Sequence, residues 1–483
     1  MTGIQDLPFD VMLQVMDRVH DRRGLYDCVR VNRAFYEAAM PALYTTISLV
    51  GLRSFESGPN FAPLNTLDKH QYLRHYVKVV EVCFGLNEYL KHPTLRNNSP
   101  QWAMSLSQLP NITALRIWHP DHHYHPIRSD FTSTLTSAVS HCEKLEDLTL
   151  MARINEADLT RFRRLKNVRR MRFGLLTSGT FSALSEWMRA SGCLSLSFMA
   201  SVVPLFKRSF FDLNVNQEAY AIEPLTMNPI NPHLNNLQTL HIGASHALSN
   251  KDITSCLSHA RQLRFFDFLY DNFLSTPFDS KAEYHVNLPH LETIVIRHSG
   301  VWSKPSCQDL FSWMRVVLSS SASLKSFSLL SDDGKEIHHP QTGLVDVLTS
   351  CSTLEILNLP SVAFRLPQLS KIFGSLKIVR VVSLFVTDVK CLDFHQQLRT
   401  RGGSKIVAFY VRSNRSTCPY FSVAPKVKEM MTTLNRSSGH FQRLSQEKQT
   451  WQALWTEGAM TDRTESSQDL LKYEYPEMYS HFA

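Results

Sequence analysis

The chain has 483 residues, of which 43% are hydrophobic and 19% are charged, a balance typical of folded proteins and not of disordered ones. This length exceeds what one compact core usually supports, so the sequence predicts either several domains or an elongated repeat array. The formal net charge of +8 is moderate for such a chain and does not indicate a nucleic-acid partner.

Neither a membrane span nor a secretory signal is expected. The strongest candidate for a span, residues 373–386, is interrupted by Lys377 and Arg380. The N-terminus carries Asp6 and Asp10 in place of an apolar signal core. The nine cysteines include no closely spaced pair, which favours reduced thiols in the cytoplasm or nucleus over a zinc module or a disulfide framework.

The first fifty residues predict a small unit of three helices. Asp6 can cap the first helix, and Pro8 is tolerated in its first turn. Asn32 can cap the third helix, which Pro41 is expected to disturb. The apolar residues of the first helix recur at three- and four-residue spacing: Val11, Met12, Val15, Met16 and Val19. Units of this size usually need a partner to bury their remaining apolar surface, although a helical cap on the next domain is the alternative.

The order and spacing of these residues resemble an F-box. The resemblance is carried by Leu7-Pro8, the aliphatic positions of the first helix, Leu25, Cys28, Val31-Asn32-Arg33, Phe35 and Pro41-Ala42-Leu43-Tyr44. The closing run leads into the first strand in a way that looks like fungal F-box proteins. The sequence departs from the F-box pattern in two minor ways. The acidic residue common just after Leu-Pro is found at Asp10, and the last helix has no tryptophan.

This resemblance covers only the N-terminal part of the chain. It implies docking onto a Skp-type adaptor, which links an F-box protein to a cullin ubiquitin ligase. The adaptor-binding residues that it implies are Leu7, Pro8, Val11, Met12, Val15, Met16, Val31 and Phe35.

An internal repeat dominates the rest of the chain. The pattern apolar-x-x-apolar-x-apolar recurs at intervals that mostly fall near the range of leucine-rich repeats. Its occurrences begin at Ile112, Leu145, Val168, Cys193, Leu237, Leu263, Leu291, Leu324, Leu354 and Leu376. Amphipathic segments suited to helices lie between them, so we predict an α/β leucine-rich-repeat-like solenoid with a parallel sheet on the concave face and helices outside. A doubly wound α/β domain is the alternative, but no Gly-rich phosphate turn supports it.

Four regions follow from these patterns. An F-box-like helical domain occupies residues 1–50, a linker 51–71, a solenoid of about ten to twelve irregular repeats 72–411, and a helical or flexible tail 412–483. Residues 201–232 of the solenoid are predicted to be a loop insertion.

Individual elements can be predicted as well. Helices are expected over residues 178–189, 309–319 and 343–351, and within the tail over 426–434 and 441–454. A final strand is expected over residues 406–411.

No catalytic or cofactor motif accompanies the repeats. The sequence lacks a Walker loop, a dinucleotide-binding Gly motif, a nucleophile elbow and an HExxH helix, so we expect neither an enzyme nor a bound cofactor. One cluster has residue types that bind metals, but its flanking prolines indicate a solvated loop, and no metal site is expected there or at His338-His339. That cluster consists of His119, Asp121, His122, His123 and His125.

A basic run crosses the third repeat. It consists of Arg161, Arg163, Arg164, Lys166, Arg169, Arg170 and Arg172. One interpretation is an anion-binding patch for an acidic or phosphorylated partner. The other, slightly favoured, is a solvated repeat edge whose arginines pair with neighbouring acids.

Strand alternation predicts which residues line the concave face, because alternate side chains point to opposite faces of a sheet. This rule nominates Arg116, Trp118, Thr149, Arg172, His241, Asp267, Arg297, Asn358 and Arg380 as target-binding candidates. Tryptophan and arginine are frequent binding hot spots.

The resemblance to an F-box, ahead of a repeat array, implies a substrate receptor of a Skp–cullin–F-box ubiquitin ligase. Its expected partners are a Skp-type adaptor, through it a cullin, and a protein target, with no nucleic acid and no membrane. A leucine-rich-repeat scaffold not linked to ubiquitination is the alternative. A hydrolase or transferase on an α/β scaffold is a third reading, for which the sequence offers no motif.

Overall fold

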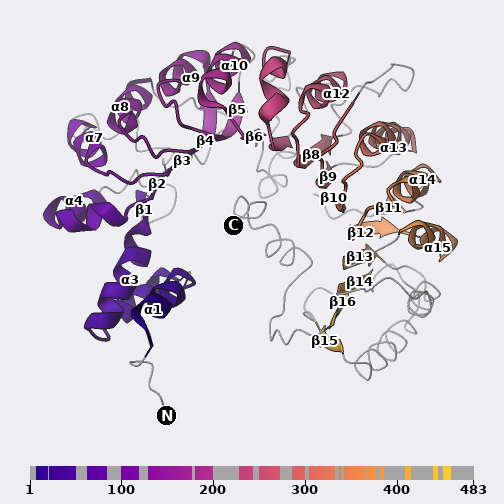
Figure 1. The fold of residues 1–483 in the computed structure, drawn as a ribbon, viewed down its shortest axis with the longest axis horizontal. Helices are drawn as coiled ribbons and strands as arrows, with labels where there is room; N and C mark the ends of the chain where they lie inside the picture. Colours follow the sequence, from indigo (N-terminus) through magenta and orange to yellow (C-terminus); the bar gives the residue numbers. More distant parts are fainter. Residues whose placement is uncertain are drawn as a thin grey trace, which may run out of the picture. The chain divides into compact units, whose positions relative to one another are not determined.

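The computed structural model describes residues 7–19, 21–49, 62–83, 99–118, 129–176, 180–198, 228–242, 250–271, 286–299, 304–331, 337–338, 342–364, 366–376, 381–385, 408–414, 439–443 and 450–457. The chain forms two compact units. Unit 1 comprises Met1–Val202 and Glu223–Asn236, and unit 2 comprises Val203–Ile222 and Leu237–Ala483. Both are built from parallel strands that alternate with helices (Figure 1).

Unit 1 begins with three short helices, which we call the helical unit. They are α1 (Phe9–Asp17), α2 (Arg22–Val29) and α3 (Arg33–Thr45). Asp21 caps α2 by accepting hydrogen bonds from two backbone N–H groups of its first turn. Asn32 caps α3 by accepting a hydrogen bond from the N–H of Phe35 at 2.9 Å, which confirms the predicted cap. Asp6 lies outside the described residues, and Pro8 stands at the N-cap of α1 without a side-chain hydrogen bond.

The helical unit has its own small core, and α1 and α2 both pack on α3. The buried residues of that core are Met12, Met16, Leu25, Ala38 and Ala39. Pro41 lies inside α3, but the helix continues to Thr45, whose hydroxyl donates to the Pro41 carbonyl at 2.7 Å. The predicted disturbance at Pro41 is therefore absent, because the helix tolerates the loss of one backbone donor.

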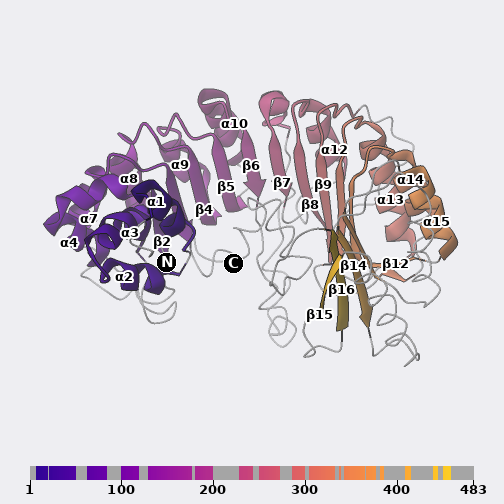
Figure 2. The same ribbon diagram turned by 60° about the horizontal axis from the view of Figure 1, so that its bottom comes forward.

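A parallel sheet follows in unit 1. Its strands are β1 (Thr46–Leu49), β2 (Val79–Cys83), β3 (Ala114–Trp118), β4 (Asp147–Ile154), β5 (Arg170–Leu176) and β6 (Ser195–Phe198), each parallel to the next. The helices between them are α4 (Ala62–Lys69), η2 (Gln71–Tyr76), α7 (Ser99–Ser107), α8 (Ser129–Val139), α9 (Glu156–Phe162) and α10 (Thr180–Ser191), and η4 (Asn231–Asn236) packs on α10. The helices α4 to α10 stand on one face of the sheet (Figures 1 and 2).

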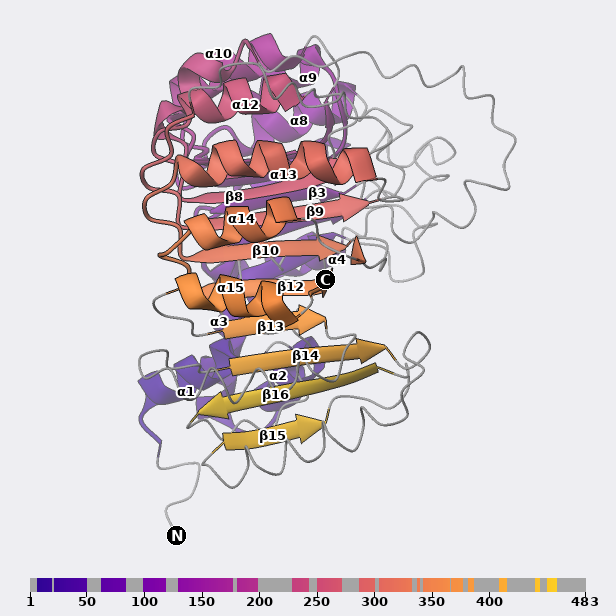
Figure 3. The ribbon, with the colours of Figure 1, turned by 90° about the vertical axis from the view of Figure 1, so that its right-hand side faces the viewer.

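Unit 2 continues the same strand–helix alternation. Its parallel strands are β7 (Thr239–Ile242), β8 (Phe265–Asp271), β9 (Thr293–Ser299), β10 (Ser326–Ser331), β12 (Ile356–Ala363), β13 (Val381–Phe385) and β14 (Ala408–Asn414), with β11 (Ile337–His338) beside β12. Its helices are α12 (Asn250–His259), α13 (Lys304–Ser319), α14 (Thr342–Ser350) and α15 (Leu366–Ser375). Figure 3 shows α13, α14 and α15 stacked over the strands on one face.

A repeated backbone contact joins successive repeats. Just before a strand begins, one carbonyl oxygen accepts hydrogen bonds from two consecutive N–H groups of the next repeat. In unit 1 these carbonyls belong to Lys78, Thr113, Glu146 and Arg169, with N···O distances of 2.8–3.1 Å. In unit 2 they belong to Gln238, Arg264, Glu292 and Lys325, with distances of 2.8–3.0 Å. The same pair of hydrogen bonds to one carbonyl oxygen therefore fixes the register at equivalent points of both units.

The core of each unit lies between the sheet and its helices. In the strands β1 to β10 the residues on either side of the central outward position are buried where their side chains are described, as Val80 and Val82 are beside Glu81. Two tryptophans are fully buried in this layer, and both satisfy their indole N–H. Trp187 donates to the Leu165 carbonyl at 3.0 Å, and Trp313 donates to Thr254 Oγ1 at 3.1 Å.

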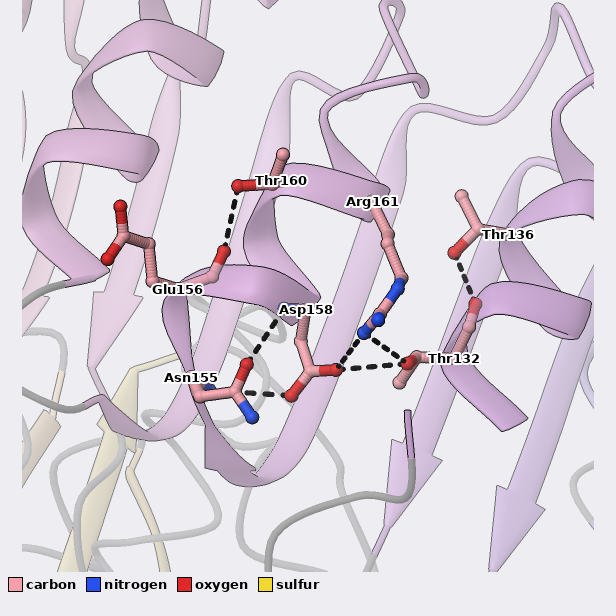
Figure 4. Close-up of polar contacts among 7 residues, drawn as sticks. All are labelled: Thr132, Thr136, Asn155, Glu156, Asp158, Thr160 and Arg161. Carbon is pink, nitrogen blue, oxygen red and sulfur yellow. Dashed lines mark hydrogen bonds and ion pairs between the residues drawn. The ribbon is translucent and has the colours of Figure 1, made fainter. Parts of the chain in front are cut away.

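A buried polar network joins two helices of unit 1 (Figure 4). Asp158 of α9 has no exposed surface, and together with Asn155 it forms a capping box at the start of that helix. Its Oδ1 accepts hydrogen bonds from Thr132 Oγ1 of α8 at 2.9 Å and from Arg161 Nη1 at 3.1 Å. This carboxylate therefore holds α8 against α9 with its charge compensated.

The structure corrects two predicted boundaries. The predicted linker 51–71 contains α4, whose Leu64 and Leu67 are buried, so residues 62–71 belong to the folded unit. The helix predicted over 441–454 is wrong, because β15 (Gly439–Arg443) and β16 (Thr450–Glu457) form there. β16 pairs antiparallel with β14, whose edge offers unpaired backbone groups, and β15 pairs with β16.

Of the other predicted elements, some are confirmed and some lie outside the described residues. The strand predicted over 406–411 is confirmed as β14, but it is not the final strand, because β15 and β16 follow it. The helices predicted over 178–189, 309–319 and 343–351 are confirmed as α10, α13 and α14. Residues 201–227 of the predicted insertion and the predicted helix 426–434 lie outside the described residues. Among the described helices, none combines the length and apolarity needed to cross a membrane.

Candidate functional site

The helical unit exposes a group of large apolar side chains. Leu7, Val15 and Val31 have 38%, 48% and 61% of their surface exposed. Such residues occur singly on most proteins, but their concentration on a unit this small is typical of an interaction site. We call this group the docking set, and it consists of Leu7, Pro8, Phe9, Val11, Val15, Tyr26 and Val31.

The two faces of α1 have different roles. Val11 and Val15 lie four residues apart and share the exposed face of the helix. Met12 and Met16 lie on the other face and are buried in the core of the helical unit. Their predicted place on an adaptor surface is therefore corrected, because a partner cannot contact them without unpacking that core. Phe35 is half-buried and packs against the same core.

Only one of the three helices carries the main contact with the sheet. α3 packs on η2 and runs directly into β1. The hydroxyls of Tyr36 on α3 and Tyr72 on η2 are hydrogen-bonded at 3.1 Å, and this bond raises the pKa of Tyr36 above its ordinary value. The docking set lies on α1, on α2 and in the segments before α1 and α3, so this contact leaves it uncovered.

The sheet face opposite the helices is polar, and we call it the polar face. In unit 1 a row of residues in register crosses it from β1 to β6: Ser48, Glu81, Arg116, Thr149, Arg172 and Ser197. Each of them stands between two buried residues of its own strand. Alternation therefore places the whole row on the face away from the helices.

Acids on neighbouring strands pair with the arginines of unit 1. Glu81 Oε1 accepts a hydrogen bond from Arg116 Nη1 at 2.9 Å. Asp147, which is opposite Arg170 in the register, lies 3.7 Å from Arg170 Nε and 3.7 Å from Arg172 Nη2. Opposite charges on adjacent strands stabilise a sheet, so these pairs neutralise most of the positive charge of the row.

In unit 2 a single aspartate occupies the equivalent position. Asp267 Oδ2 lies 2.9 Å from His241 Nδ1 and also accepts a hydrogen bond from Arg297 Nη2. Burial alone would raise the pKa of Asp267, but the charges and hydrogen bonds of Arg297 and His241 outweigh it and hold the pKa below its ordinary value. Because a carboxylate can only accept, the Nδ1 of His241 must carry a proton.

Several buried polar atoms of this face have no hydrogen-bond partner within the described part of the protein. In unit 1 these atoms are Arg116 Nε, Asp147 Oδ1 and Thr149 Oγ1. In unit 2 they are His241 Nε2, Asp267 Oδ1, Ser326 Oγ and Ser328 Oγ. Since buried polar atoms of native proteins are nearly always hydrogen-bonded, we expect water or a ligand to satisfy these atoms.

These contacts change the predicted target-binding set. Arg116, Arg172 and Arg297, predicted as target-binding candidates, are each paired with an acid of a neighbouring strand. His241 and Asp267 are likewise partners of each other. Trp118 ends β3 and Asn358 lies on β12, but their side chains lie outside the description, as does Arg380 altogether.

The sequence analysis missed the acids, Glu81 and Asp147. A signal for Glu81 was present, because it stands between Val80 and Val82 at the outward position of its strand. Asp147 stands two residues before the outward Thr149, which places it on the same face. Which arginine each acid meets could not be predicted without the register.

The basic run is partly neutralised, and four of its seven basic residues pair with acids as the second interpretation predicts. Arg161 pairs with Asp158, Arg163 with Glu186, and Arg170 and Arg172 with Asp147. The remaining basic residues of the run, Arg164, Lys166 and Arg169, are exposed.

No metal-binding cluster is found among the residues that the structure describes. The sequence cluster from His119 to His125 lies outside them, and so does His339.

Comparison with known proteins gives similarity to solved structures only. No protein-family model matches the chain, and no curated protein matches it. Among solved structures, the fold is similar to the crystal structure of an internalin from Listeria monocytogenes, at 12% sequence identity. The match covers 81% of this chain and 96% of that chain, with a TM-score of 0.32.

Proposed function

We propose that this chain is a protein-binding scaffold that serves as the substrate receptor of a Skp–cullin–F-box ubiquitin ligase in the cytoplasm or nucleus. The helical unit docks a Skp-type adaptor, and the polar face holds a protein target. The chain itself performs no chemistry in this proposal, because the conjugating enzyme is held elsewhere in the complex.

The observation that carries the proposal is the docking set. Its side chains are large and apolar, yet they remain exposed while the core of the same helices is formed by other residues. Burying an apolar side chain fully in an interface stabilises it by about 1.5–3 kcal/mol, so several of them together can hold an adaptor. The resemblance of this segment to an F-box supports the adaptor as the partner.

Adaptor binding can be tested with exposed residues alone. The full chain is expected to bind a purified Skp-type adaptor, and the double change Leu7→Ala, Val15→Ala is expected to weaken binding at least tenfold, since each truncation removes about 1–2 kcal/mol of apolar burial. Titration calorimetry measures the affinity. Both residues are exposed, so the melting temperature should stay the same.

Met104→Ala is the matched control for this experiment. Met104 is an exposed apolar residue of α7, with 62% of its surface accessible, and it lies outside the helical unit. Its truncation should leave adaptor affinity unchanged. A wild-type chain that does not bind any Skp-type adaptor would refute the proposal.

The alternative is a scaffold not linked to ubiquitination, in which the three helices only cap the sheet. The packing of α3 on η2 and its continuation into β1 favour such a capping role. The same titration separates the two functions, because a pure cap gives no adaptor binding.

A further inference from the structure

The polar face of unit 1 contains a small group of buried atoms with unused hydrogen-bonding capacity. Arg116 on β3 and Thr149 on β4 are partners in register, so their side chains lie on neighbouring strands about 4.8 Å apart. Asp147 stands two residues before Thr149 on the same strand. We call these three residues the β3–β4 site.

The unused atoms of this site are of complementary kinds. Arg116 Nε can only donate a hydrogen bond, Asp147 Oδ1 can only accept one, and the Thr149 hydroxyl can do both. A ligand that satisfies all three must present an acceptor and an N–H donor close together. A carboxamide or a main-chain peptide group has this combination.

The charges around the site disfavour other ligands. Asp147 is already shared by Arg170 and Arg172, so a cationic ligand would meet two positive groups. The arginines that could bind an anionic or phosphorylated ligand are already paired with Glu81 and Asp147, so such a ligand would have to displace one of these carboxylates. A neutral amide avoids both penalties while it satisfies the buried atoms.

The rim of the site is partly exposed, while its three unused atoms are buried. Asp147 and Thr149 form a buried floor, with 8% of the Asp147 side chain exposed. Arg170 and Arg116 stand beside it with 44% and 30% of their side chains exposed. An extended segment lying on the strands could therefore place one amide over the floor.

Unit 2 gives an independent observation of the same kind. Asp267 Oδ1 is buried without a partner and can only accept a hydrogen bond, so it calls for an N–H donor. Arg297 next to it opposes a further cation, so a neutral donor fits best here too.

From these observations we infer that the polar face recognises an extended, uncharged polypeptide segment through its amide groups, either main-chain or of Asn and Gln side chains, and not an acidic or phosphorylated segment. This inference deepens the proposed function and rests on it, in that the polar face is the surface that holds the target. It implies that a target is recognised without prior phosphorylation.

A synthetic peptide array tests the ligand class with the full chain as probe. The array carries extended heptapeptides whose central positions are Asn or Gln in one set, Asp or Glu in a second, phosphoserine in a third, and Lys or Arg in a fourth. We expect the Asn/Gln set to be bound best, with little change between 0.15 and 0.5 M salt, because no net charge is paired.

Thr149→Val tests the site itself. Its hydroxyl has no partner within the described protein, so the variant should melt at the same temperature as the wild type or above it. Loss of one hydrogen bond to the ligand should weaken binding of the selected peptide about 3- to 10-fold. Thr136→Val, a buried threonine of α8 on the helix side, is the matched control and should leave peptide binding unchanged.

The outcomes separate this inference from the proposed function. Preference for acidic, phosphorylated or basic peptides overturns it, and so does a Thr149→Val variant that binds the selected peptide as the wild type does. If no peptide set is bound, the buried atoms are satisfied by water and the inference fails. Adaptor binding, measured on the same preparation, reports on the proposed function independently of all these results.

Discussion

Asp267 is a buried carboxylate whose ionised form is stabilised by its neighbours. Arg297 and His241 hold its pKa below the ordinary value even though burial acts in the opposite direction. An aspartate with a depressed folded-state pKa contributes stability above its unfolded pKa of about 3.9, and this contribution is lost as the pH falls through the folded-state value. Within that window the stability of unit 2 falls by about 1.4 kcal/mol per pH unit from this residue alone.

Asp267→Asn removes this acid dependence. At pH 7 the variant is expected to be less stable by about 3 kcal/mol, because Arg297 and His241 then lack their charged partner in a buried site. As the pH falls below about 4, the difference between wild type and variant should shrink. Denaturant unfolding at several pH values measures it, and a difference that stays constant down to pH 2 would contradict the assignment.

The ends of the helices depend on single positions. α10 ends at Ser191, and Gly192 follows with a φ of 64°, a left-handed conformation that favours glycine. The N–H of Gly192 donates to the Met188 carbonyl at 3.1 Å, so the residue closes the last turn of the helix. An added Cβ would meet no atom within 4 Å, so only the backbone conformation opposes a substitution.

Gly192→Ala is therefore expected to lower the free energy of unfolding of unit 1 by about 1 kcal/mol. Gly192→Asn is the matched control and should cost less, because asparagine tolerates the left-handed region. Urea denaturation followed by circular dichroism gives both values. Equal stability of the alanine variant and the wild type would show that this conformation is not required.

On the scale of the whole molecule, the reactivity of buried cysteines shows whether the core of each unit stays closed. Cys142 and Cys193 lie in unit 1, and Cys256 and Cys351 lie in unit 2. Burial raises the pKa of Cys142 to about 11 and that of Cys193 to about 12, and it raises those of Cys256 and Cys351 as well. Since the thiolate is the reactive form, these four thiols should be inert in the folded protein.

Alkylation followed by mass spectrometry tests this expectation. With iodoacetamide at pH 8, Cys28 of the helical unit, which is only half-buried, should be modified before these four buried cysteines, which should react only in denaturant. Modification of Cys256 or Cys351 under native conditions would mean that the core of unit 2 opens. Modification of Cys142 or Cys193 under native conditions would mean that the core of unit 1 opens.

Much of the architecture could be predicted from local patterns. The two-residue alternation of the strands, the amphipathic helices and the Asn32 cap depend on residues close in the chain, so the sequence alone determined them. The tail is the exception, since β15 and β16 form where a helix was predicted. There the unpaired edge of β14 overrides local helix propensity, because pairing satisfies backbone groups that a helix would leave exposed.

The sequence by itself determined which residues face away from the helices, because alternation is a local property of a strand. Only the tertiary structure decided what those residues do. Glu81 meets Arg116 from a position 35 residues away in the chain, and this pairing depends on the register of two strands. Likewise, the spacing on α1 grouped Met12 with Val11, but packing on α3 buries Met12 in the core and leaves Val11 exposed. Charge pairing and burial depend on contacts between distant segments, and local patterns do not encode those contacts.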